Sequence, residues 1–278
     1  SGNVRNHKEY AGMNRISGAI CEIHHMDMLA SRDQWVNRIH PLVKLVLTIL
    51  YISAVVSFHK YDVAGTAGMA VYPMALFILA ELSFADSLKR LRLVLPLVCF
   101  VGILNPFLDQ NAVVIEGIRI SAGVLSMVTL IMKGVFSVLA SYLLIATTSV
   151  DRLCYALRLL RIPKAVATQF MLTYRYITVL LEEVDRITQA YLLRAPHQKG
   201  IHFKAWGPLA GQLLLRSMDR ANEVYDSMLL RGYRGDYAYL RERTAFQGKD
   251  LAYLLFWAAV IALLRRWPVV LLAGELFS

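Results

Sequence analysis

The chain has 278 residues, of which 57% are hydrophobic and 18% charged, and its formal net charge is +10. Soluble domains carry about 25% charged residues, so this composition excludes a disordered chain and argues against an ordinary soluble enzyme. The mean hydropathy of +0.47 and the basic surplus are typical of a polytopic membrane protein with Lys and Arg in its cytoplasmic loops.

The N-terminal segment, residues 1–40, has no long apolar run, and its first residues, Ser1 and Gly2, are typical of a cloning or cleavage remnant. The three cysteines, Cys21, Cys99 and Cys154, lie far apart and form no CxxC pair. Neither a disulfide framework nor a Cys-based zinc site is therefore expected.

Five apolar runs reach or approach the length of a membrane-spanning helix, which is about 20 residues. They are 41–58, 63–80, 93–108, 120–150 and 251–264. The first contains Lys44, whose long side chain can snorkel from near the helix end. The fourth contains Lys133. A charged residue inside a span is a functional-site hypothesis, and the alternative that we favour is that Lys133 faces a partner subunit or lies near a helix kink.

The orientation of the spans follows from the positions of the basic residues. The loop at 81–92 contains Lys89, Arg90 and Arg92, whereas the loops at 59–62 and 109–119 carry one basic residue each. The positive-inside rule then places the 81–92 loop and the N-terminus in the cytoplasm. The C-terminus falls outside, although Arg265 and Arg266 after the last span fit that side poorly.

Residues 151–247 differ in kind, because charged residues are frequent and two long amphipathic helices are predicted. Pro163 opens the first helix and Pro196 stops it. Trp206, Gly207 and Pro208 are expected to precede the second, and Gly232 to end it as a C-cap. The apolar faces consist of Phe170, Tyr174, Ile177, Leu181, Val184 and Tyr191 in the first helix, and Leu214, Met218, Ala221, Tyr225 and Met228 in the second. A shorter helix at about 151–161 comes before both.

Each long helix ends in a related tripeptide. The first reads Leu193-Arg194-Ala195 and the second Leu230-Arg231-Gly232. An Arg in the last turn of a helix interacts favourably with the helix dipole, and this structural role is enough to explain an Arg at such a position. The same Arg places a planar, permanently charged donor at the tip of a rigid helix, where it suits a partner's carboxylates.

Three other patterns in the sequence bear on function. No P-loop is present, because Gly248-Lys249 lacks the upstream glycine and is followed by Asp250, so ATP hydrolysis by this chain is not expected. The run His24-His25-Met26-Asp27 lacks the spacing with which side chains converge on one metal ion. The basic and aromatic residues around Arg175 alternate on an amphipathic helix, and we expect no nucleic-acid binding.

Several ordered stretches resemble the transmembrane T component of energy-coupling factor (ECF) transporters, in particular the cobalt/nickel branch, the CbiQ/EcfT family. They are Ile39-His40-Pro41-Leu42-Val43-Lys44-Leu45, Ala146-Thr147-Thr148, the run from Ala156 to Pro163, Leu172-Thr173-Tyr174-Arg175-Tyr176 with Leu180-Leu181-Glu182-Glu183, the run from Arg216 to Ala221, and the run from Met228 to Tyr233.

The resemblance implies that the two arginine-bearing helix ends dock in grooves of two ATP-binding-cassette ATPases and pass ATP-driven movement to a substrate-binding S component. It assigns ATPase coupling to Leu193, Arg194, Ala195, Leu230, Arg231 and Gly232. The first signature departs from the family, because Ala195 and Pro196 stand where a glycine is usual. The substrate metal is held by the S component in this family, so no cofactor or metal is expected on this chain, and ATP is hydrolysed by partner subunits.

We therefore predict an all-α, multi-pass protein of the cell inner membrane, with about five transmembrane helices and a cytoplasmic coupling domain of about three helices. Its parts are the segment 1–40, spans one to four at 41–150, the coupling domain at 151–247, and a last span with a tail at 248–278. Its partners would be two ATPases, an S component and the lipid bilayer, and the resemblance also leaves room for a further small membrane subunit. Cobalt or nickel is the expected substrate. The alternatives are a vitamin importer of the same type and, from another class, an autonomous membrane carrier or membrane enzyme.

Overall fold

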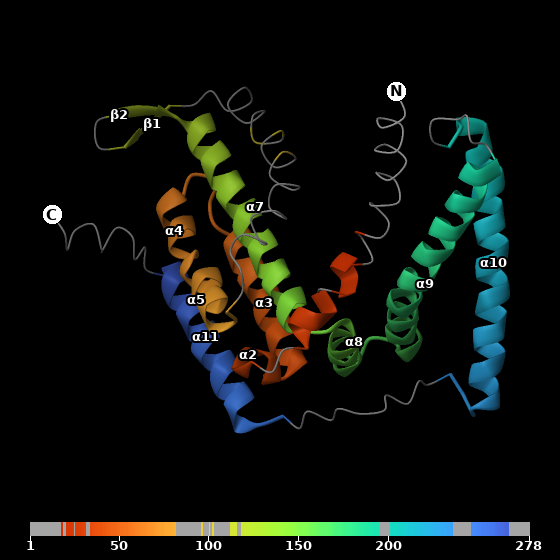
Figure 1. The fold of residues 1–278 in the computed structure, drawn as a ribbon. Coiled ribbons are helices and arrows are strands. Elements are labelled where there is room, and N and C mark those ends of the chain that lie inside the picture. The colour runs from red at the N-terminus through yellow and green to blue at the C-terminus, as the bar shows by residue number, and fades with distance from the viewer. Residues whose placement is uncertain are drawn as a thin grey trace. The chain divides into compact units, whose positions relative to one another are not determined.

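Helices dominate the part of the chain that the computed structural model describes, which comprises residues 18, 21–24, 26–31, 34–81, 96, 100, 102, 112–115, 118–194, 201–235 and 246–266. The chain divides into two compact units. One, the bundle unit, consists of Ala30–Ser149 with Arg243–Ser278, and the other, the hairpin unit, consists of Ser1–Leu29 with Val150–Glu242. Figure 1 labels the elements of both.

In the bundle unit, α3 (Pro41–Val56), α4 (Val63–Gly68), α5 (Val71–Leu79), α7 (Ala122–Thr147) and α11 (Gly248–Arg266) lie side by side, with the short α2 (Trp35–Arg38) before α3 (Figure 1). Helix α3 packs on both α7 and α11, and α7 also packs on α4 and α5. The predicted helical class is thus confirmed for the residues described, apart from one short pair of strands. The predicted span at 93–108 lies almost wholly outside those residues.

The pair of strands joins the start of α7. Strands β1 (Ala112–Ile115) and β2 (Ile118–Ser121) are antiparallel, with Ala112 opposite Ser121 and Ile115 opposite Ile118. Both strands are rich in β-branched Val and Ile, which favour extended backbone. The sequence analysis took 109–119 as a loop between two spans, and it did not anticipate that this connection forms two short strands.

The apolar run at 63–80 is broken into α4 and α5 rather than forming one straight helix. Pro73 has no N–H to donate to the carbonyl of Met69 four residues earlier. The hydroxyl of Tyr51 donates to that carbonyl instead, at 2.9 Å, from a fully buried position on α3. The break thus follows from a proline whose lost hydrogen bond is replaced by a neighbouring helix.

Two lysines link α3 and α7 in a reciprocal way. The Lys44 ammonium donates to the carbonyl of Thr147 at the end of α7, at 2.8 Å. The Lys133 ammonium, on α7, donates to the carbonyls of Val56 and Phe58 at the end of α3. The last carbonyls of a helix have no partner in their own helix and carry partial negative charge, so each lysine stabilises the end of the other's helix.

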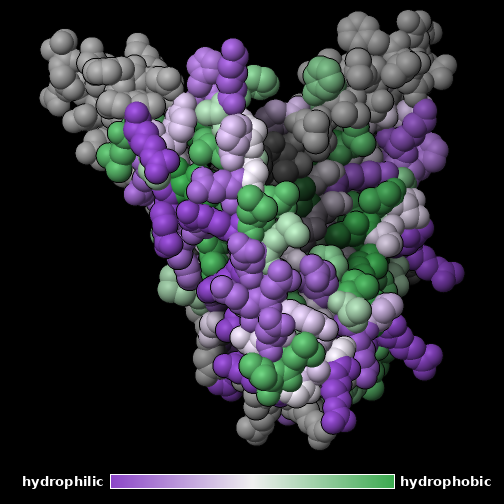
Figure 2. All heavy atoms as spheres, turned by 90° about the vertical axis from the view of Figure 1, so that its right-hand side faces the viewer, coloured by the Kyte–Doolittle hydropathy of each residue, from purple (hydrophilic) through white to green (hydrophobic). Residues whose placement is uncertain are grey.

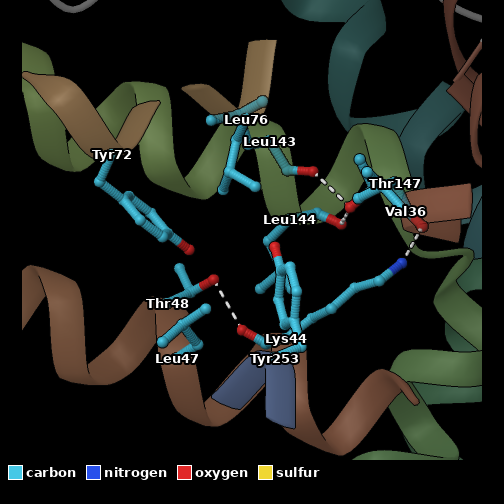
Figure 3. Close-up of a pocket in the computed structure, with 10 residues that line it drawn as sticks. All are labelled: Val36, Lys44, Leu47, Thr48, Tyr72, Leu76, Leu143, Leu144, Thr147 and Tyr253. Carbon is cyan, nitrogen blue, oxygen red and sulfur yellow. Dashed lines mark hydrogen bonds between the residues drawn. The ribbon is translucent and has the colours of Figure 1, made fainter. Parts of the chain in front are cut away.

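Figure 3 shows the contact of Lys44 with Thr147. Lys44 is only 7% exposed and its side chain extends toward Thr147, beside a small cavity that is also lined by Thr48 and Tyr253. The expectation that Lys44 snorkels to the surface is therefore wrong. Its ammonium remains inside the bundle because a helix end provides an acceptor there.

A buried carboxylate joins the starts of α3 and α11, through a hydrogen bond between two residues that are 210 positions apart in the sequence. Asp250 accepts from the backbone N–H of His40, the N-cap of α3, at 3.0 Å, and from that of Gln247, just before α11, at 2.9 Å. At the other ends of the same helices, the Arg265 guanidinium donates to the Ser57 hydroxyl at 2.8 Å. The two helices therefore run parallel.

In the hairpin unit, α8 (Val150–Leu159) packs on α9 (Lys164–Arg194), which runs beside α10 (Phe203–Leu230) (Figure 1). The helix predicted at 151–161 is confirmed within two residues. The start of the second long helix was misplaced, because Trp206, Gly207 and Pro208 lie inside α10. Its N-terminus is set by His202, whose ring Nδ1 accepts from the backbone N–H of Lys204, and Pro208 removes only one hydrogen bond from an exposed first stretch of the helix.

Candidate functional site

The two predicted coupling arginines lie at opposite ends of the α9–α10 hairpin. The helices are antiparallel, because Glu183 of α9 pairs with Arg216 of α10 while Tyr191 and His202 meet near the connection. Arg194 is the last residue of α9 and Arg231 is the C-cap of α10. A helix of 28 residues is about 42 Å long at 1.5 Å per residue. The two arginines therefore lie far apart, on separate parts of the surface of the hairpin.

The end of α10 has a well-defined cap around the second arginine. Gly232 adopts φ of +83°, which is a left-handed conformation that glycine takes without steric cost. Its N–H donates to the carbonyl of Leu229 and that of Tyr233 to the carbonyl of Met228, both at 2.9 Å. This is the Schellman arrangement, as the C-cap prediction for Gly232 implied. It holds Arg231 at a rigid corner, beside Leu230, which is 89% exposed.

The end of α9 is different in form. Arg194 and Leu193 belong to the last turn of α9, and Leu193 is 82% exposed. Ala195 and Pro196 lie outside the described residues. Both helix ends thus present one exposed leucine next to one arginine, although only the second has a described glycine cap.

Arg194 lines a groove between α9 and α10. The groove encloses a cavity of about 180 Å³, and we call it the arginine groove because three of its side chains are guanidinium groups. It is lined by Arg186, Ile187, Ala190, Tyr191, Arg194, Leu209, Gln212 and Arg216. Sequence reasoning identified Arg194 as a helix-end residue but missed Arg186 and Arg216, since only the antiparallel pairing brings α10 alongside.

One carboxylate serves two of these arginines. Glu183 pairs with Arg216 across the hairpin and with Arg186 on its own helix, the latter at 3.5 Å. The Glu183 side chain is 19% exposed, against 72% for Arg186 and 48% for Arg216. A single negative charge thus faces two positive ones, and with Arg194 the groove carries a net positive charge.

Helix α10 leaves its apolar side chains uncovered within the described structure. None of its residues is buried, and Leu214, Met218 and Tyr225 from the predicted apolar face are all more than half exposed. Figure 2, which looks onto the α10 side of Figure 1, shows hydrophobic side chains at the surface among hydrophilic ones. Exposed apolar residues on a charged helix are typical of a surface that binds a protein partner.

The N-terminal part of the chain is attached to α9 by a hydrogen bond that sequence reasoning missed. The Tyr174 hydroxyl donates to the Asp27 carboxylate at 2.9 Å. Burial, followed by this hydrogen bond and the negative charge of Asp27, raises the pKa of Tyr174 to about 12. Asp27 belongs to the run His24-His25-Met26-Asp27, and this contact occupies it with a structural partner. His25 lies outside the described residues.

In the ranges that the structure describes, no three His, Cys, Asp or Glu side chains gather closely enough to hold a metal ion. Lys133, in the apolar helix α7, donates hydrogen bonds to the end of α3, which agrees with a structural role near a helix end. The described helix ends of the hairpin unit instead present exposed leucine and arginine side chains at two separate places.

Comparison with known proteins identifies the family of the chain. The family model described as cobalt transport protein, CbiQ, matches residues 32–243. The energy-coupling factor transporter transmembrane protein EcfT of Bacillus subtilis is 25% identical over 251 residues, which cover 82% of this chain and 92% of that protein. The protein of the same name from Bacillus selenitireducens is 28% identical over 261 residues, which cover 83% and 93%. The matched region contains α3 to α10 and both arginine-bearing helix ends, and the chain belongs to the CbiQ cobalt transport protein family.

Proposed function

We propose that this chain is the transmembrane coupling subunit, or T component, of an ECF-type importer. In this role it links ATP hydrolysis by two cytoplasmic ATPases to an S component that binds the substrate. The observation that carries the proposal is the placement of Arg194 and Arg231 at opposite ends of one helical hairpin. Two separate arginine-tipped ends suit two ATPase subunits, one at each end.

The bundle unit supports a membrane location. Residues Gly123–Thr147 of α7 form a helix long and apolar enough to cross a membrane, while Pro41–Val56 and the stretch Val63–Leu79 are apolar but shorter. Large apolar side chains such as Ile49, Ile78 and Phe256 are exposed on the surface of this unit. In a bilayer they would contact lipid, at no cost in exposed apolar area. About five spans in the inner membrane remain our proposal.

The helix directions support the predicted topology. With the N-terminus in the cytoplasm, α3 leads outward and α7 inward, and α11 leads outward because it runs parallel to α3. Arg265 then lies at the outer end, which the positive-inside rule disfavours. Its hydrogen bond to Ser57, the C-cap of α3, provides a local reason for a cation there.

The substrate that we propose is cobalt, with nickel as the near alternative. The family description supports cobalt, whereas the proteins named EcfT share the coupling role without naming a substrate. A complex assembled from this chain and its native partners should take up radioactive Co²⁺ in preference to Ni²⁺ and vitamins. Uptake of a vitamin instead would place the chain in the other branch of the transporter class.

The coupling role is tested with charge reversals at the two helix ends. Arg194→Glu and Arg231→Glu should leave the chain in the membrane but weaken its binding to the ATPases, and the double variant should abolish transport. Arg220→Glu is a matched control, because Arg220 is exposed on α10 and its ion pair, within the described part of the chain, is with Glu223 of the same helix at 3.4 Å. Normal assembly and transport in the double variant would refute the role.

A further inference from the structure

The arginine groove has features of a binding site that the two helix-end arginines alone do not provide. It is a cavity rather than a flat surface, and its wall combines the guanidinium groups of Arg186 and Arg216 with the aliphatic side chains of Ile187 and Leu209. Arg and Tyr are enriched among the residues that dominate protein interfaces. A side chain with apolar methylene groups and a charged end would meet matching chemistry along such a wall.

We propose that an acidic side chain of one ATPase subunit inserts into the arginine groove and forms ion pairs with Arg186 and Arg216. The proposal rests on the proposed function, because it names a second contact of the same partner that docks at Arg194. The occupant is argued from charge. Glu183 neutralises only part of the positive charge of the two arginines that it contacts, and Arg194 adds a third.

The surroundings favour a protein segment over a lipid headgroup. Leu193 at the end of α9 and Phe203 at the start of α10 are 82% and 89% exposed, and both flank the connected end of the hairpin beside the groove. Exposed apolar side chains next to polar and charged ones mark surfaces that bind a protein partner. Guanidinium groups pair with carboxylates through two parallel hydrogen bonds, which fix orientation.

The pairing with Glu183 explains how the groove stays open without a partner. The Glu183–Arg216 pair holds α9 and α10 at a set distance. Arg186 lies on the same helix as Glu183 and is largely exposed, so it is free to turn toward an incoming carboxylate without loosening the hairpin. A substitution of Arg186 should therefore weaken partner binding without unfolding the hairpin.

The first test measures affinity with the full chain in nanodiscs and the purified ATPase subunits that assemble with it. Arg186→Glu should weaken ATPase binding about tenfold, as expected when an interfacial charge pair is reversed. Arg220→Glu, one turn beyond Arg216 and outside the groove, should leave the affinity within about twofold of the unchanged chain. Equal affinities of the two variants would overturn the proposal.

The second test locates the occupant by photo-crosslinking. Benzoylphenylalanine placed at Gln212, in the groove, should crosslink to an ATPase peptide that contains Asp or Glu, and the same group at Leu230 reports docking at the other helix end. Crosslinks from Leu230 but none from Gln212, or crosslinks from Gln212 to lipid, would refute groove binding and leave the coupling role intact. Absence of ATPase crosslinks from both positions would refute the coupling role itself.

Discussion

Lys44 and Lys133 bind the C-terminal ends of each other's helices. The first reaches from α3 to Thr147 at the end of α7, and the second reaches from α7 to Val56 and Phe58 at the end of α3. Each ammonium lies against the negative end of a helix dipole. The two contacts hold the antiparallel pair together at two points and give both lysines a structural role.

Replacing either lysine should destabilise the bundle unit. Lys44→Met and Lys133→Met keep side-chain length but leave helix-end carbonyls without their donor, at a cost of about 1–3 kcal/mol each. Thermal unfolding in detergent should show lower midpoints for both variants. Lys60→Met is the control, because Lys60 is exposed and lies over the ring of Tyr61 in the loop after α3. Loss of transport by Lys133→Met at unchanged stability would instead support a functional lysine.

The Asp250 carboxylate should stabilise the bundle unit by holding the start of α11 against the start of α3. Asp250→Ala removes the acceptor for the His40 and Gln247 N–H groups and leaves buried donors unpaired, which should cost about 2–4 kcal/mol. Asp250→Asn retains an oxygen and should cost less. Unfolding midpoints of the two variants, compared at equal detergent concentration, measure the difference, and equal midpoints would argue against the role of Asp250 as the acceptor.

His40 should make the bundle unit less stable in acid. Burial lowers the pKa of His40, and the charge of Asp250 opposes this only in part. As the pH falls, His40 of the unfolded chain therefore takes up a proton near pH 6.5, whereas His40 of the folded chain does so only at a lower pH. The free energy of unfolding is therefore highest above about pH 6.5 and decreases as the pH falls toward the pKa of His40 in the folded chain. Protonation also places a hydrogen on Nδ1, which accepts from Leu42 N–H.

The check is a comparison of unfolding midpoints between pH 7.5 and 5.5 for the unchanged chain and for His40→Asn. Asn caps helices well and does not titrate in this range. The pH-dependent decrease should be smaller in the variant, and an identical decrease in both would assign the effect to another group.

Arg161 should be a point of local strain in the hairpin unit. It adopts φ of +64° at the end of α8, where its N–H donates to the carbonyl of Arg158 and that of Ile162 to the carbonyl of Leu157. This is the position that glycine usually takes. Arg161→Gly should therefore raise stability by up to about 1 kcal/mol, measured by chemical unfolding. A decrease would show that the Arg161 side chain makes a contact worth more than the strain.

The sequence predicted the helices well, because periodic apolar and charged residues mark them directly. Pro163, Gly232 and the run from Gly123 to Thr147 are examples in which a local pattern determines a local structure. The β1–β2 pair was missed because the short run of Val and Ile was assigned to a loop. Pro208 was misjudged because a proline in the first turns of a helix costs little once His202 caps the end.

The remaining features depend on contacts between distant residues. Neither the burial of Lys44 beside Thr147 nor the joining of His40 to Asp250 follows from spacing along the chain. The arginine groove likewise appears only when α9 and α10 are antiparallel, since Arg186 and Arg216 are 30 residues apart in sequence and share Glu183 in space. The helix-end arginines could be found from sequence, but their opposite placement could not.

The most direct test of the coupling role is purification of this chain in mild detergent from its native membranes, with identification of the bound proteins by mass spectrometry. We expect P-loop ATPases and a small membrane protein to be recovered with the unchanged chain. The ATPases should be lost when Arg194 and Arg231 are both changed to Glu. Recovery of the chain alone, under conditions in which other membrane complexes survive, would contradict the coupling role.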